Sequence, residues 1–130
     1  MPTVISIEAG ADKVAQGISK DAAIKALKCS VEKALKAAKV PIDPNAKQGY
    51  DLKAKIVSLT VNTQGKPPTM EVTIAITLSH IGGATKLIKA SNSGTKEGFD
   101  IKKLDAAAAG LIDDVVSAQL DKNGKVLKAM

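Results

Sequence analysis

The chain has 130 residues, of which 45% are hydrophobic and 25% charged, a composition typical of a folded globular domain and not of a disordered segment. It contains one cysteine and one histidine, which excludes an internal disulfide framework and any metal site that needs several cysteines or two histidines from one chain. The formal net charge is +6, and all 19 basic residues are lysines.

We therefore expect one domain covering residues 1–130, without a cofactor and without a transmembrane segment, because no apolar run approaches the roughly 20 residues of a membrane span. Arginine and aromatic side chains supply most base-reading and stacking contacts, and this chain has no arginine and only 2% aromatic residues. No specific nucleic acid is expected as a partner. The first residues show no signal-peptide pattern, so a cytoplasmic protein and a mature exported domain with an added Met1 both stay open.

The first part of the chain predicts a strand, a loop and a helix. Residues 3–8 alternate as a short strand does, and residues 10–17 read as a loop bounded by glycines. Ser19 is a good N-cap for a helix over residues 20–39, which Pro41 ends. The predicted apolar face of this helix consists of Ile24, Leu27, Val31, Leu35 and Ala38. The opposite stripe consists of Lys25, Lys28, Glu32, Lys36 and Lys39.

Three strands are predicted next, over residues 50–62, 69–80 and 84–91, with turns between them. In the first of these the apolar set changes parity between Ile56 and Val57. Such a change is typical of a β-bulge or of a strand end that is covered on both sides. The strand over 69–80 has the clearest alternation in the sequence, with apolar residues at even positions and Thr, Ser, Ala and Glu at odd ones.

Residues 92–95 are predicted to be a polar loop, and Asp100 is predicted to cap a second helix that runs to Leu120. Its expected apolar stripe consists of Ile101, Leu104, Ala108, Leu111, Val115 and Ala118. Residues 125–129 are read as an optional final strand. The fold class that follows is α+β: a two-layer sandwich of the order β-α-β-β-β-α(-β), with two amphipathic helices packed on one face of a mostly antiparallel sheet.

No group of residues in the sequence has the spacing of a catalytic or metal site. Cys29 is expected in the middle of a helix, where a packed thiol is the usual interpretation. His80 ends a strand and is interpreted as a satisfied edge residue, because no partner cluster is visible. Asp113 and Asp114 are adjacent on a helix, so their side chains diverge. We expect a protein that is not an enzyme.

The segment from Tyr50 to Leu59 resembles the "Y-x-L-x-G-x-V-x-x-L" strand of small bacterial envelope domains, with Ala54 at the position of the glycine. This group includes the TolB amino-terminal domain, the curli-secretion lipoprotein and the lipoprotein activators of penicillin-binding proteins. The element order is similar over residues 3–121. The resemblance implies a non-enzymatic domain that binds another envelope protein, in the periplasm, at the outer membrane or after secretion.

The leading hypothesis is thus an envelope adaptor or assembly domain whose partner is another envelope protein or a second copy of itself. The candidate interaction surface consists of Lys25, Lys28, Lys36, Lys39, Thr73, Thr77 and Ser79. An exposed sheet edge is a further means of association. Two alternatives remain: a basic nucleic-acid-binding domain of ferredoxin-like fold, and a small-ligand-binding protein with a polar pocket near His80.

Overall fold

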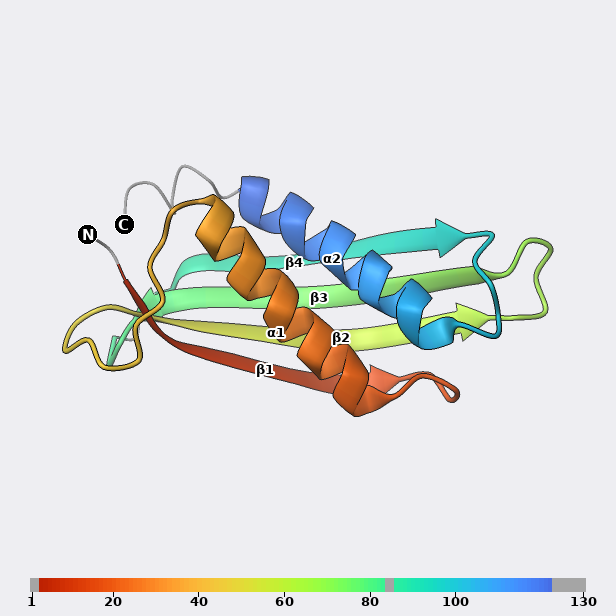
Figure 1. Ribbon diagram of the computed structural model, residues 1–130, viewed down its shortest axis with the longest axis horizontal. Helices are drawn as coiled ribbons and strands as arrows, with labels where there is room; N and C mark the ends of the chain where they lie inside the picture. Colours follow the sequence, from red (N-terminus) through yellow and green to blue (C-terminus); the bar gives the residue numbers. More distant parts are fainter. Residues whose placement is uncertain (1–2, 84–85, 123–130) are drawn as a thin grey trace.

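The computed structural model describes residues 3–83 and 86–122 (Figure 1). Its elements follow in the predicted order. They are β1 (Val4–Val14), α1 (Lys20–Ala37), β2 (Tyr50–Asn62), β3 (Thr69–His80), β4 (Lys86–Glu97) and α2 (Leu104–Lys122). The limits of β2 and β3 are those predicted from the sequence. The optional strand over residues 125–129 lies outside the described residues.

Within the described residues, four strands form one open sheet in the order β1-β2-β3-β4, so β1 and β4 are the two edges of this described sheet. Strand β1 runs parallel to β2, and the other two pairs are antiparallel. Both helices lie on the same face of the sheet (Figure 1). Helix α1 packs on β1 and β2, and α2 packs on β4 and β3. The predicted α+β two-layer sandwich is confirmed.

The core is aliphatic and lies between the helices and the inner face of the sheet. Its largest fully buried side chains include Leu27 and Leu35 of α1, Ile74 and Ile76 of β3, and Ile112 of α2. Strand β3 alternates because every second residue points to the helices and the others point away from them. The predicted parity change in β2 is confirmed as a register shift between Ile56 and Ser58.

Two strands are longer than the sequence indicates. Strand β1 does not end at Glu8, because its parallel pairing with β2 continues to Val14. The loop predicted over residues 10–17 is therefore wrong for most of its length. The polar loop predicted over residues 92–95 is also wrong, because these residues pair with β3 and β4 extends to Glu97. In both cases backbone pairing overrides a weak local strand propensity.

Helix α2 begins at Leu104 and not after Asp100. The Asp100 carboxylate accepts a hydrogen bond from the Lys102 backbone N–H at 2.9 Å, which forms a turn ahead of the helix. The predicted stripe is displaced as well: Ile101 is 51% exposed and Ala118 is exposed. Buried residues that the stripe missed are Ala107, Ile112, Val116, Gln119 and Leu120. The apolar side is broad because α2 packs on both the sheet and α1.

Helix α1 agrees better with its prediction. Leu27, Val31 and Leu35 are fully buried, while Ile24 and Ala38 are only partly buried. The Ser19 hydroxyl caps the helix by accepting from the Ala22 backbone N–H at 3.2 Å, as predicted. The helix ends at Ala37 because Ala38 is its C-cap and the next residue has a positive φ of 61°.

Candidate functional site

The predicted interaction residues lie on two opposite faces of the molecule. Lys25, Lys28 and Lys36 are exposed on α1, in the helix layer, and Lys39 follows the end of that helix. Thr73 and Thr77 are at odd positions of β3, on the sheet face that the helices do not cover. Because the sheet separates the two sets, they cannot form one continuous contact surface.

The outer face of the sheet is polar but largely uncharged at β3 and β4. Thr73 and Ser93 are cross-strand partners, and their hydroxyl oxygens are 2.7 Å apart. Thr73 and Thr77 are half-buried, whereas Ser79 is only 8% exposed and is a poor candidate for direct contact. The usable part of the predicted polar surface is therefore the outer face formed by the two threonines and the neighbouring residues of β4.

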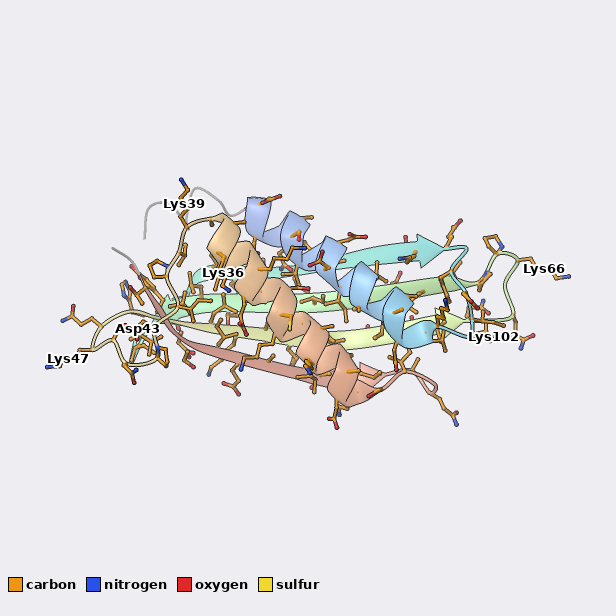
Figure 2. All side chains as sticks on the ribbon, in the orientation of Figure 1. Lys36, Lys39, Asp43, Lys47, Lys66 and Lys102 are labelled. Atoms are coloured by element: carbon orange, nitrogen blue, oxygen red, sulfur yellow. The ribbon has the colours of Figure 1, made fainter. Side chains whose placement is uncertain are left out.

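The described chain exposes lysines in several places. Figure 2 shows Lys36, Lys39 and Lys47 toward one end of the molecule, and Lys66 and Lys102 at the other. On the helix layer Lys33 contacts Asp113 of α2 at 3.5 Å. Among the described residues, exposed lysines therefore occur on the helix layer and at both ends of the molecule.

The sequence analysis predicted the first half of β4 and proposed a sheet edge for association, but it missed the second half of β4 and did not say which strand forms the edge. It is an edge strand of 12 residues, and its central part, Ala90–Thr95, contains no charged residue and no proline. Soluble proteins usually protect such edges with charges, prolines or bulges, because an unpaired strand edge is a template for a further strand. The β4 edge, defined here as residues 89–97, is therefore a candidate binding site for another strand.

A groove runs beside this edge on the helix side. It has a volume of about 370 Å³ and is lined by residues 92–95 of β4 and by Leu111, Asp114, Val115 and Ala118 of α2. A Cβ on Gly94 would lie 2.5 Å from Val115 Cγ2, which shows that helix α2 approaches β4 closely here. The groove therefore extends the β4 edge with a partly apolar wall.

The packed-thiol interpretation of Cys29 is wrong. The side chain is exposed on α1. It lies four residues from both Lys25 and Lys33, so it shares the solvent side with the lysines and not the side of Leu27.

We expect the thiol of native Cys29 to react with a disulfide reagent such as Ellman's reagent, because access limits the reaction of a buried thiol but not of an exposed one. One equivalent should react in the folded protein at a rate within about threefold of that in denaturant. Stopped-flow absorbance measures both rates. A thiol that reacts only after unfolding would contradict the exposed position, and Cys29→Ala is the blank.

His80 does not continue the buried side of β3. It is exposed at the end of the strand, and its ring lies 4.6 Å from that of Tyr50, at an angle of 32° between the planes. Tyr50 is its direct partner in the β2–β3 pairing, so the two rings meet as cross-strand neighbours. His80 therefore packs against Tyr50 at the corner of the sheet. This agrees with its interpretation from the sequence as a satisfied residue at the end of a strand.

Among residues 3–83 and 86–122, no three His, Cys, Asp or Glu side chains gather as metal ligands would. Within the same residues no helix is long and apolar enough to cross a membrane.

This architecture, an open sheet covered by two helices on one face, is one that bacterial lipoproteins also have. The structure resembles protein XCC0632 of Xanthomonas campestris, with a TM-score of 0.75, 11% identity, and coverage of 98% of this chain and 86% of that one. It also resembles lipoprotein GNA1162 of Neisseria meningitidis, with a TM-score of 0.61, 12% identity, and coverage of 95% and 99%.

A third solved structure is a dodecamer of PelC from Paraburkholderia phytofirmans, with a TM-score of 0.56, 19% identity, and coverage of 89% of this chain and 87% of that one. At these identities the likeness shows the fold alone. No model of a protein family matches the sequence, and no curated protein matches it. The fold agrees with the small envelope domains that the Tyr50 segment resembles.

The topology also bears on the nucleic-acid alternative. In a split βαβ unit another strand lies between the two parallel strands. Here β1 and β2 are parallel and directly paired. The ferredoxin-like fold considered in the sequence analysis is therefore wrong for this chain.

Proposed function

We propose that this chain is a non-enzymatic domain of the bacterial envelope that acts by binding another protein, either an envelope protein or a second copy. The observation that carries the proposal is the β4 edge: a long strand that pairs with β3 on one side, has no neighbour among the described residues on the other, and has an uncharged centre with a groove beside it. An edge of this kind binds an extended partner through backbone hydrogen bonds.

The envelope part of the proposal is supported by the shared fold. Lipoprotein GNA1162 has this architecture, and the PelC structure is a dodecamer, so the fold is compatible with self-assembly. The absence of enzymatic activity is supported by the separation of the reactive side chains. Cys29 lies in the helix layer and His80 at a strand end, where it stacks on Tyr50.

The proposal is tested in the cells that make the protein. Intact cells are treated with a lysine-reactive crosslinker, then separated into cytosolic and envelope fractions, and the chain is detected with an antibody. We expect the chain in the envelope fraction, in crosslinked species that are reduced in a Ser93→Pro variant, because proline removes a donor and distorts the edge. A cytosolic chain that binds single-stranded RNA at physiological salt would overturn the proposal.

A further inference from the structure

We propose that the β4 edge pairs with the β4 edge of a second copy, antiparallel, about a two-fold axis at Ser93, so that Lys89 of each copy lies opposite Glu97 of the other. The inference rests on the proposed function, which it deepens by naming the partner and the register. It joins two four-stranded sheets into one sheet of eight strands.

The register follows from the alternation of side chains along β4. Ser91 and Ser93 pair with Ala75 and Thr73, which places them on the outer face, while Ile88 pairs with Leu78 and is buried on the inner face. Opposite residues of two joined strands must point to the same face. For two copies of one strand in antiparallel order, this requires the axis to pass through a residue and not between two.

Charge selects among these registers. With the axis at Ser93, Lys89 faces Glu97 of the other copy, Ser91 faces Thr95, and Ser93 faces itself. All five side chains are exposed on the single chain. With the axis at Asn92 or Gly94, neither Lys89 nor Glu97 has an opposite charge as its direct partner. Opposite charges in direct cross-strand positions stabilise a sheet, and like charges destabilise it.

The other edge of the sheet is less suited to receive a strand. Strand β1 carries charged residues at Glu8, Asp12 and Lys13, and the Asp12 carboxylate is already 3.0 Å from Lys55 Nζ. Glu8 lies in the middle of β1, whereas the middle of β4, Ala90–Thr95, carries no charge. Charges are one of the features by which natural edge strands avoid further pairing.

The groove beside β4 also supports a second copy of the chain as the partner. A second copy related by this axis brings its own groove against the first, because both grooves flank residues 92–95. The exposed α2 residues of the two grooves, Asp114 and Ala118, then lie toward one another. Isologous contact of one patch with itself is the commonest form of protein oligomer, and antiparallel pairing is slightly more stable than parallel pairing.

The test is a charge exchange across the axis, measured by sedimentation velocity over a concentration series. We expect the wild type to dimerise, and Lys89→Glu and Glu97→Lys each to weaken the dimer by at least about tenfold, because each places two pairs of like charges face to face. The double variant K89E/E97K restores opposite charges, so its dissociation constant should return to within about threefold of the wild-type value. Lys13→Glu, an exposed change on β1 opposite the uncharged Ser58, is the matched control and should leave the dimer unchanged.

A wild type that stays monomeric at millimolar concentration would overturn the inference, as would a double variant no stronger than either single one. These outcomes are distinct from failure of the proposed function. A monomer that still crosslinks to envelope proteins in cells keeps the proposed function and removes the dimer. A dimer formed by a cytosolic chain removes the envelope role and keeps the dimer.

Discussion

Gly94→Ala should destabilise the protein by about 1–3 kcal/mol, because an added methyl group overfills a closed contact. The new Cβ would lie 2.5 Å from Val115 Cγ2 and 3.4 Å from Leu111 Cδ1. Since Val115 belongs to α2 and Gly94 to β4, the change pushes the helix away from the edge strand. Urea unfolding followed by circular dichroism measures the loss of free energy of unfolding.

Two variants make this measurement specific. Gly10→Ala is the matched control, because Gly10 also lies in a strand, β1, yet an added Cβ has no atom within 4 Å. Val115→Ala removes the methyl group that clashes, so the double variant G94A/V115A should be more stable than the sum of the single effects predicts. Equal stabilities of the Gly94 and Gly10 variants would show that α2 does not approach β4 closely.

Leu27→Ala should cost about 2–5 kcal/mol, the range for removing a large aliphatic side chain from a closed core. Leu27 is 0% exposed and belongs to the inner side of α1, which packs on β1 and β2. The space left behind cannot collapse fully, since the sheet below it is fixed by backbone pairing on both sides of β2.

Ile24→Ala is the control for this change, because Ile24 is on the same helix and the sequence predicts it on the same face, but it is only partly buried. Its cost should be clearly smaller in the same urea experiment. Equal costs would mean that the apolar face of α1 is oriented differently from the one described.

The sequence predicted the structure correctly where the spacing of apolar residues matches which side chains are buried. The strict alternation of residues 69–80 and the three- and four-residue spacing of Leu27, Val31 and Leu35 correspond directly to burial. The parity change at Val57 correctly indicated the irregularity in β2. These features could be predicted because one face of each element is buried and the other is not.

The errors arise where long-range pairing decides the structure. Residues 92–95 have the composition of a loop, and they form a strand only because β3 extends beside them. In α2 the apolar side is wide and rich in alanine, so its centre could not be located by periodicity, and Ile112 and Val116 were missed. Cys29 was interpreted as packed because free cysteines are usually buried, and this general preference does not hold for an exposed position on α1.

The candidate site was the least predictable part. The lysines of α1 and the threonines of β3 were read as one surface, but which faces they occupy depends on how helix and sheet are stacked. A sheet edge was proposed, but β4 could not be identified as that edge without the strand order, which places β3 on one side of β4 and no described strand on the other. The importance of the charges at Lys89 and Glu97 could not be predicted either, because it depends on the position of β4 at the edge of the sheet.

The most direct measurement is amide hydrogen exchange along residues 89–97 at a low and a high protein concentration. In a single chain, every second residue of β4 points its N–H away from β3 and exchanges with water. Our account predicts that these outward amides exchange more slowly at high concentration, while β1 is unchanged. Exchange in β4 that is independent of concentration, or protection that appears at β1 instead, would contradict it.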